Sequence, residues 1–476
     1  MCRKINHSAR SSRAFLLGEA MDYQNFISSK QIAVSQSGFE PHNLSGSLFE
    51  YQRHCVEFAL RAGRSAMFLD TGLGKTFCQL EYAREVVEHT NQPVLVLTPL
   101  AVAAQTAREA DKFGIDAKVI RDDGDVFNGV NIINYDRLDR LDVSQFSGVI
   151  LDESSILKNF SGKTRNQLVN AFRNTPYRLA CTATPSPNDH TELGNHSEFL
   201  GVLNHADMLP RWFINDTMNV GDWRLKGHAV RPFWDWVASW SRCVSKPSDL
   251  GFSDFGFDLP ALNIERHVID FESSAESQGQ LFASPELSAT GIHAVKKESA
   301  EHRSAKVAEM ANGSDEPWLI WCDTDIEADH LARLIPDAVE VRGSDKIEHK
   351  EESLLGFADG KIRVLITKPS IAGFGMNWQH CNNMAFVGLT YSYEAFYQAV
   401  RRCWRFGQTK SVNAHLVMTH AEAAIWRNVS SKADSHDAMK REMREAMQRN
   451  AGVKVDQRLA YQPQRAADLP QWLRSA

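Results

Sequence analysis

The sequence has no long apolar run, no paired cysteines and no excess of positive charge. None of its apolar stretches approaches the roughly 20 residues that a membrane-spanning helix needs. Its eight cysteines include no Cys-x-x-Cys pair and no accompanying histidine pair, so neither a zinc site nor a disulfide framework is predicted. The formal net charge of −6 excludes a globally basic surface for nucleic acid and leaves room only for a local groove. We therefore expect a reduced, cytoplasmic protein without membrane association.

At 476 residues the chain is too long for one ordinary core, and two or three domains are expected. Its 43% hydrophobic and 24% charged residues are typical of a globular protein. The first 20 residues carry four basic side chains against one acidic one. We expect residues 1–40 to form a partly disordered leader, with Met21 as an alternative start, and residues 451–476 to form a C-terminal tail.

Short apolar runs that end abruptly in polar or small residues predict buried parallel strands. Four such runs come first, at 94–99, 130–135, 148–153 and 178–185. A second series follows at 318–322, 362–367, 384–387 and 413–418. Helical patterns such as 77–89 separate the runs, so the predicted fold class is α/β with two parallel-sheet lobes. Ligands of such sheets bind at the carboxyl ends of the strands.

The two series of strands place a first lobe at 41–205 and a second lobe at 263–450. Residues 206–262 between them are expected to form an α-helical, tryptophan-rich insert. Its tryptophans alternate with basic residues, which suits the stacking of bases, but Phe233, Val237 and Trp240 fall at helical spacing, which favours packing in a core.

A predicted helix near residues 434–449 carries apolar side chains on one face. They are Met439, Met443, Ala446 and Met447. We expect this face to dock on the second lobe.

The segment Asp-Thr-Gly-Leu-Gly-Lys-Thr follows a predicted strand at 65–69 and opens a predicted helix, which is the pattern of a phosphate-binding loop. Backbone N–H groups at the start of such a helix surround phosphate oxygens. Lys75 would neutralise the β and γ phosphates, and Thr76 would place its hydroxyl on Mg²⁺. Leu69 stands at the first position of the pattern, where glycine is usual. The other loop residues assigned to nucleotide binding are Thr71, Gly72 and Gly74.

Asp152 and Glu153 close a Val-Ile-Leu strand, 77 residues after Lys75. In this arrangement the aspartate holds Mg²⁺, and the glutamate orients or deprotonates the attacking water. An Asp-Glu pair after a strand often only begins a helix, but the phosphate loop favours the catalytic interpretation. Thr182 and Thr184 close another strand and offer hydroxyls that can link this site to a second one, with an ST-turn as the alternative.

Arg402 and Arg405 are three residues apart on a helix that we expect to begin near Tyr393. Two guanidinium groups on one face can stabilise charge on a γ-phosphate in the transition state. A solvated basic face is the alternative, and the flanking Gln398 and Gln408 disfavour it. With the phosphate loop in the first lobe, these arginines predict hydrolysis of a nucleoside triphosphate between two lobes.

Together these motifs resemble those of superfamily-two helicases, and within them the SWI/SNF-like branch of DNA translocases. The most branch-specific segment is Arg-x-x-Arg-x-Gly-Gln, from Arg402 to Gln408. Ser154 and Ser155 after the carboxylates resemble phage and prophage members of the group. In chain order, the segments that carry the resemblance are Gln52, 69–76, 98–99, 134–135, 152–159, 182–185, 372–377 and 398–408.

The resemblance implies two RecA-like lobes with ATP and Mg²⁺ between them, and DNA, preferably duplex, across both. It assigns Gln52 to the adenine, Gly375 to the nucleotide, and Arg402 and Arg405 to a site completed when the lobes close. Contacts with nucleic-acid phosphates are expected at or near strand ends. The candidates are Thr98, Lys158, Thr367 and Lys368.

Three alternatives stay open. A helicase that separates strands, including strands of RNA, uses the same motifs. A nucleic-acid-binding scaffold would need the ATP site only as a switch, and a ring-forming ATPase would borrow its arginine from a neighbouring subunit. The sequence leaves the oligomeric state open and is compatible with a monomer in a bacterial or phage-infected cell.

Overall fold

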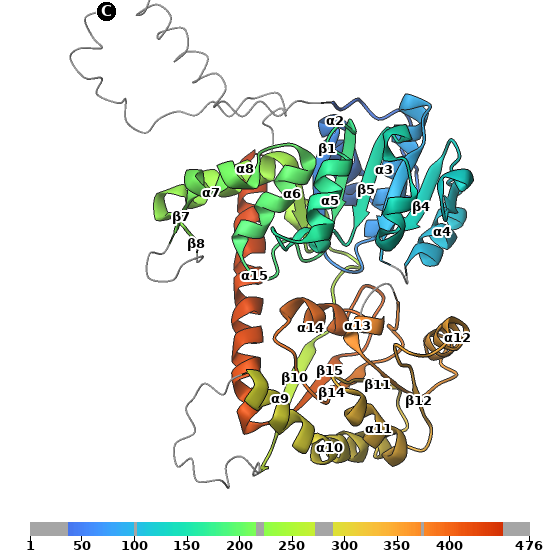
Figure 1. The fold of residues 1–476 in the computed structure, drawn as a ribbon, viewed down its shortest axis with the longest axis vertical. Helices are drawn as coiled ribbons and strands as arrows, with labels where there is room; N and C mark the ends of the chain where they lie inside the picture. The colour runs from blue at the N-terminus through green and yellow to red at the C-terminus, as the bar shows by residue number, and fades with distance from the viewer. Residues whose placement is uncertain (1–36, 100–101, 216–222, 272–288, 373–375, 451–476) are drawn as a thin grey trace, which may run out of the picture.

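The computed structural model describes residues 37–99, 102–215, 223–271, 289–372 and 376–450. Two parallel sheets form two lobes, one above the other in Figure 1, which confirms the predicted fold class. Most of the expected leader, the whole of the expected tail and Met21 lie outside the described residues. Across the described parts, no helix combines the length and apolar character needed to cross a bilayer.

The sheet of the first lobe has seven parallel strands in the order β3-β4-β2-β5-β6-β1-β9. Every residue of β2, β5 and β6 is buried, because helices cover both faces of a parallel sheet. The strands are β1 (Arg64–Leu69), β2 (Val94–Thr98), β3 (Ala117–Val119), β4 (Val130–Asn134), β5 (Gly148–Asp152), β6 (Tyr177–Cys181) and β9 (Ser241–Val244). The helices of this lobe are α2 (Glu50–Ala62), α3 (Lys75–Thr90), α4 (Ala103–Lys112), α5 (Lys163–Ala171) and α6 (Leu193–Leu200).

The sheet of the second lobe has six parallel strands in the order β10-β15-β14-β11-β13-β12. Its strands are β10 (Leu262–Ile269), β11 (Trp318–Trp321), β12 (Ala338–Glu340), β13 (Val364–Thr367), β14 (Asn383–Phe386) and β15 (Val412–Thr419). Its helices are α9 (Ala289–Glu298), α10 (Ala300–Asn312), α11 (Asp325–Leu334), α12 (Ile347–Ala358), α13 (Pro369–Ala372) and α14 (Tyr393–Val400).

The tryptophan-rich insert contains α7 (His205–Trp212), the hairpin of β7 (Phe213–Asn215) and β8 (Trp223–Leu225), and α8 (Val230–Trp240). Trp212 and the three tryptophans of α8 are buried in the same core cluster as the first sheet, which agrees with packing rather than base stacking. β9, which follows α8, pairs with β1 and adds a strand that the periodicity did not predict.

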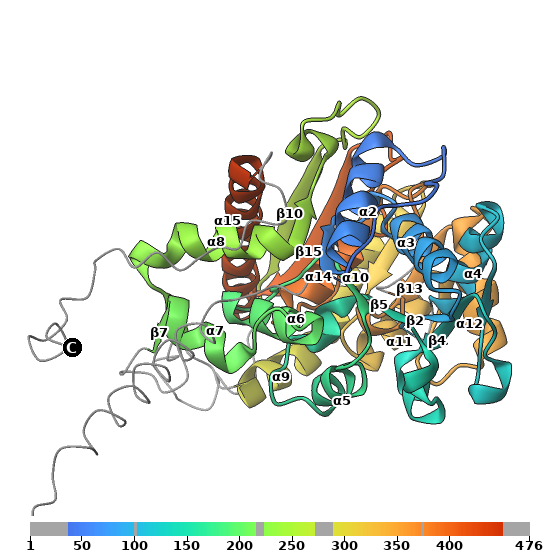
Figure 2. The ribbon, with the colours of Figure 1, turned by 90° about the horizontal axis from the view of Figure 1, so that it is seen from above.

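The last helix, α15 (Ala423–Asn450), runs along both lobes on the side that also carries α7 and α8 (Figure 1 and Figure 2). Its first half packs into the second lobe through Ile425 and Val429. The predicted docking of its methionine face on the second lobe is wrong, because these methionines belong to the core of the first lobe and the insert. Met447, for example, accepts a hydrogen bond at Sδ from the backbone N–H of Cys243 in β9, at 3.3 Å.

The helix expected to carry Arg402 and Arg405 is shorter than predicted. α14 ends at Val400, and both arginines lie in the turns that follow. The side chain of Arg402 folds back and donates from Nε to the carbonyl of Gln398, one of the carbonyls that a helix end leaves without a backbone partner. Gly407, with φ +89°, lets the chain turn away.

Candidate functional site

The phosphate loop joins the end of β1 to the start of α3. Gly72 and Gly74 have φ values of +95° and +70°, in the left-handed region that favours glycine. A Cβ on Gly74 would lie 2.2 Å from Nε2 of Gln52, and one on Gly72 would lie 2.8 Å from the backbone nitrogen of Phe406. The two glycines are therefore required both by the backbone and by close neighbours. Thr71 and Thr76, at either side of the loop, are half-buried.

Gln52 holds the loop from the first-lobe side. Its Nε2 donates to the carbonyl of Leu73 at 2.9 Å, and its Oε1 accepts from the backbone N–H of Phe49 at 3.0 Å. The amide predicted to contact the adenine thus has both of its polar atoms bonded to backbone, one of them in the phosphate loop.

Lys75 brings the phosphate loop and the carboxylates together. Its Nζ lies 2.7 Å from Oε1 of Glu153 and 3.7 Å from Oδ1 of Asp152, and Gln79 of α3 donates to the same Oδ1 at 2.8 Å. Burial raises the pKa of Asp152 against the lowering effect of the Lys75 charge. Burial opposes the charge on Lys75, but the two carboxylates keep its pKa above the ordinary value.

Glu153 has an unusual backbone, with φ 55° and ψ 54°. Outside glycine this left-handed conformation costs energy and is concentrated at functional sites. It turns the chain at the end of β5, and its Oε2 accepts from the hydroxyl of Thr182 at 3.4 Å. The hydroxyl of Tyr135 donates to the carbonyl of Asp152 at 2.7 Å and supports the same turn.

The arginine-bearing turn of the second lobe lies against the phosphate loop. Besides the contact between Gly72 and Phe406, the Cβ of Arg405 lies 3.5 Å from the position that a Cβ on Gly72 would take. Arg402 and Arg405 both donate to the carbonyl of Met376, at 3.1 and 3.2 Å. Burial and the charge of Arg405 lower the pKa of Arg402 to about 10.

A buried cluster of charges joins the first residue of the loop to the second lobe and to α15. Asp70 accepts from Nη2 of Arg401 at 3.2 Å, from the hydroxyl of Tyr397 at 2.9 Å and from Nζ of Lys440 at 2.5 Å. Burial alone would raise the pKa of Asp70, but Lys440 and Arg401 lower it to about 2. Arg401, which follows the last residue of α14, thus contributes to contact between the lobes.

The threonines Thr182 and Thr184 connect the carboxylate site to the second lobe. The hydroxyl of Thr182 contacts Glu153, and the hydroxyl of Thr184 donates to Oε1 of Glu394 at 3.4 Å. Oε2 of Glu394 accepts from Nζ of Lys158 at 2.5 Å. The backbone N–H of Thr184 donates to the hydroxyl of Thr182 at 3.1 Å, so a chain of polar contacts leads from Glu153 to Lys158.

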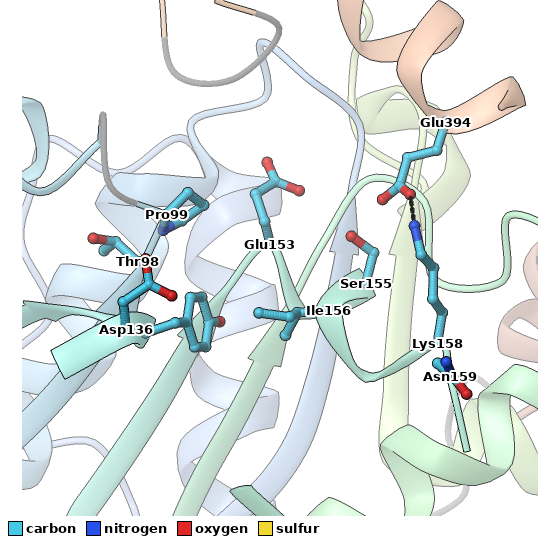
Figure 3. Close-up of a pocket in the computed structure, with 10 residues that line it drawn as sticks. Thr98, Pro99, Asp136, Glu153, Ser155, Ile156, Lys158, Asn159 and Glu394 are labelled. Carbon is cyan, nitrogen blue, oxygen red and sulfur yellow. Dashed lines mark hydrogen bonds and ion pairs between the residues drawn. The ribbon is translucent and has the colours of Figure 1, made fainter. Parts of the chain in front are cut away.

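Glu153, Lys158 and Glu394 line a cavity of about 360 Å³ that also touches the ends of β2 and β4 (Figure 3). Thr98, another predicted nucleic-acid contact, lies at its wall, and its hydroxyl contacts Asn134 at 3.5 Å. Ser155 from the segment after β5 also faces this cavity.

The other two predicted nucleic-acid contacts lie elsewhere. Thr367 is buried at the end of β13, where its hydroxyl donates to the carbonyl of Val341 at 3.2 Å. Lys368 pairs with Asp325 at 2.9 Å. The predicted nucleotide ligand Gly375 lies outside the described residues.

Sequence reasoning missed Glu394, Gln79 and the pair of Asp70 and Lys440. Gln79 lies one helical turn after Lys75 on the same face of α3, so helical spacing could have identified it. Glu394 and Lys440 reach the first lobe across 210 and 370 residues of chain, and no local pattern marks such contacts.

Comparison with known proteins agrees with this geometry. Residues 302–407 match the helicase conserved C-terminal domain. The chain is 22% identical over 435 residues to the SWI/SNF-related matrix-associated actin-dependent regulator of chromatin subfamily A-like protein 1 of Xenopus laevis, covering 82% of this chain and 44% of that protein. It is 22% identical over 478 residues to the bovine (Bos taurus) DNA annealing helicase and endonuclease ZRANB3, covering 89% of this chain and 43% of that protein.

A phage relative matches over nearly its whole length. The protein p41 of Acyrthosiphon pisum secondary endosymbiont phage 1 is 22% identical over 477 residues, covering 84% of this chain and 98% of that protein. With its two parallel-sheet lobes and the matched domain, the chain is similar to helicases. Of these relatives, the Xenopus protein is named as SWI/SNF-related and the bovine protein as a DNA annealing helicase. The chain spans less than half the length of the vertebrate relatives it matches.

Proposed function

We propose that this chain is a motor that hydrolyses ATP and moves along DNA, preferably duplex DNA. The contact between the phosphate loop at Gly72 and the arginine-bearing turn at Arg405 and Phe406 carries the proposal. It brings a phosphate cradle and two guanidinium groups from different lobes to one place, so that hydrolysis can depend on closure. The bovine relative is named a DNA annealing helicase, which favours DNA as the partner.

The residues around the loop fit a nucleoside triphosphate with Mg²⁺. The N-terminus of α3 and Lys75 offer the positive charge that phosphates require, and Thr76 and Asp152 offer oxygen ligands for the ion. ATP supplies the free energy of phosphoanhydride hydrolysis. Glu153 orients the attacking water and accepts its proton. It is suited to this role because it directly follows β5 and because Lys75 and Thr182 hold its carboxylate in place.

Arg402 and Arg405 stabilise the charge that develops on the transferred phosphoryl group. Their side chains come from the second lobe, and the carbonyl of Met376 fixes both. Cleavage of the bound phosphates would change the contacts of Glu153, which is bonded to Thr182. The neighbouring Thr184 is bonded to Glu394, so the change would reach the second lobe. Each cycle of closure and opening would thereby step the lobes along one strand.

The cavity beside Glu153 is the proposed place where the nucleic-acid backbone passes. Lys158 is 41% exposed there and held by Glu394, so a phosphate oxygen can take the place of the carboxylate. Thr98 lines the same cavity at the end of β2. Thr367 and Lys368 are now bonded to other residues of the second lobe. They would contact the nucleic acid only after these bonds break.

ATP turnover by the purified chain, alone and with duplex DNA, single-stranded DNA or RNA, tests the function, with Lys75→Ala as the inactive control. We expect strong stimulation by duplex DNA that the control lacks. Stimulation by RNA or single strands alone would instead identify a conventional helicase. A folded protein with no stimulated turnover would contradict the motor and support a scaffold with an ATP switch.

Displacement of a third strand from duplex DNA, beside displacement of one strand of a duplex, separates translocation from unwinding. We expect the first reaction and not the second. A ring-forming ATPase would lose turnover on dilution, whereas the present arrangement supplies its arginines from the same chain.

A further inference from the structure

The edge of the second sheet carries two histidines and a glutamate on one face. β10 is the edge strand, and among the described strands β15 is its neighbour. Glu265 lies directly opposite His415 in the register of these strands. His267 is two residues further along β10, so it projects from the same face as Glu265.

The ligand atoms of the three side chains lie close together. Nε2 of His267 lies 3.1 Å from Nδ1 of His415, which lies 3.4 Å from Oε2 of Glu265. The third side of the triangle, from Oε2 of Glu265 to Nε2 of His267, measures 3.9 Å. All three atoms lie within 4.8 Å of one another.

These distances match one face of a metal coordination tetrahedron. Ligands about 2.1 Å from a Zn²⁺ ion in tetrahedral geometry lie about 3.4 Å apart. The circle through the three atoms has a radius of about 2.0 Å, so an ion slightly above their plane is at bonding distance from each. No backbone movement is needed to close the site.

The surroundings orient one of the imidazoles and leave the site open to solvent. The indole ring of Trp318 stacks on the ring of His415, with centroids 5.4 Å apart and planes at 25°, and fixes its orientation. The side chains of His415, His267 and Glu265 are 13%, 26% and 53% exposed, so a fourth position faces water.

We propose that Glu265, His267 and His415 bind one divalent transition-metal ion of the Zn²⁺ type, which clamps β10 to β15. Two imidazoles and a carboxylate favour such an ion over Mg²⁺ or Ca²⁺, which prefer oxygen ligands. β10 is the first strand of the second sheet after the segment that leaves the first lobe, and a clamp at this edge would hold that lobe's entry strand in register. The proposal is independent of the ATP site.

Titration of the full chain without an affinity tag tests the site, with Zn²⁺ followed by calorimetry and Co²⁺ by its visible absorption. We expect one ion per chain, a Co²⁺ spectrum without thiolate charge-transfer bands, and a rise in Tm on addition of Zn²⁺. His267→Ala and His415→Ala should each weaken binding by roughly 10- to 100-fold.

His420→Ala is the matched control, because His420 is exposed in the same lobe and pairs with an aspartate, Asp270, outside the triad. It should bind the ion like the unchanged protein. Glu265→Gln tests the carboxylate in a variant whose exposed position leaves folding intact, and it too should weaken binding. Equal affinity in the control and the three triad variants, or no uptake by the unchanged chain, would overturn the proposal.

Discussion

The ammonium group of Lys440, near the end of the chain, donates a 2.5 Å hydrogen bond to Oδ1 of Asp70, the first residue of the phosphate loop. Arg401 of the second lobe holds the other oxygen of the same carboxylate. One buried aspartate therefore joins the nucleotide loop, the arginine-bearing turn and the helix that runs along both lobes. A shift of the loop at Asp70 would break its hydrogen bond with Lys440 of α15.

Replacing Lys440 by methionine keeps the length of the side chain and removes its charge. We expect a loss of about 2 kcal/mol in the free energy of unfolding, since a buried carboxylate loses a charged hydrogen-bond donor. Urea denaturation measures this loss. Lys432→Met is the control, because Lys432 lies on the same helix and contacts only the neutral Asn188 at 3.0 Å in the described structure. Equal losses in the two variants would show that the contact with Asp70 contributes nothing.

Glu153→Gln should lower DNA-stimulated ATP turnover by about 100-fold or more, because a general base is worth roughly that factor. Nucleotide binding should persist, since Lys75 keeps its place beside Asp152. Turnover assays and binding of a fluorescent ATP analogue measure the two effects. Glu57→Gln, on α2 and paired with Arg61 of the same helix, should leave both unchanged. Undiminished turnover in the Glu153 variant would remove that residue from the reaction.

Gly72→Ala should reduce turnover more than nucleotide binding, because the added methyl group meets the backbone of Phe406 at 2.8 Å and forces the second lobe away. The φ of +95° adds strain. Measuring kcat and the affinity for ATP separately reveals the difference. Gly46→Ala, where a Cβ meets no atom within 4 Å, should behave like the unchanged protein. A normal kcat in the Gly72 variant would contradict the role of this contact in closure.

Lys158→Ala should weaken DNA binding about equally for all sequences and reduce the salt dependence of log K by about one. The reason is that one phosphate contact is lost at the cavity beside Glu153. Fluorescence anisotropy over a series of salt concentrations measures both quantities. Lys361→Ala is the control, since Lys361 is exposed and pairs with Asp359 in the second lobe. An unchanged salt slope would place the nucleic acid elsewhere.

His436 gives the stability a pH dependence. Burial and the charge of Lys440 lower its pKa from 6.5 to about 3. The contribution of the neutral His436 ring to the free energy of unfolding is complete above pH 6.5 and declines as the pH falls toward 3. The reason is that the unfolded chain binds a proton that the folded chain excludes. The loss approaches about 1.4 kcal/mol per pH unit. The groups that surround the ring are Lys440, Asp70, Arg401, His190, Tyr393 and Tyr397.

His436→Phe should remove this part of the pH dependence between pH 6 and pH 4.5, as followed by urea denaturation at each pH. His420→Phe provides the comparison, because His420 is 76% exposed and beside Asp270. If the free energy of unfolding varied with pH in the same way in both variants, His436 would take up its proton in the folded state.

Most strands were predicted correctly because a strand buried on both faces needs a continuous apolar run, which is visible locally in β2, β5 and β11. β9 and β10 were missed for the opposite reason. β9 lies next to a helix of tryptophans that obscures its pattern, and β10 is an edge strand whose residues are mostly exposed.

The sequence by itself determined the order of the motifs, the phosphate loop and the strand ends that carry Asp152 and Glu153. These features are local, because a few consecutive residues fix the backbone that performs the chemistry. The tertiary structure alone decided that the methionine face of α15 packs on the first lobe, that Lys440 meets Asp70, and that His267 meets His415 across two strands. Such contacts depend on strand register and on the packing of distant segments, and a single sequence does not display the partner of a side chain hundreds of residues away.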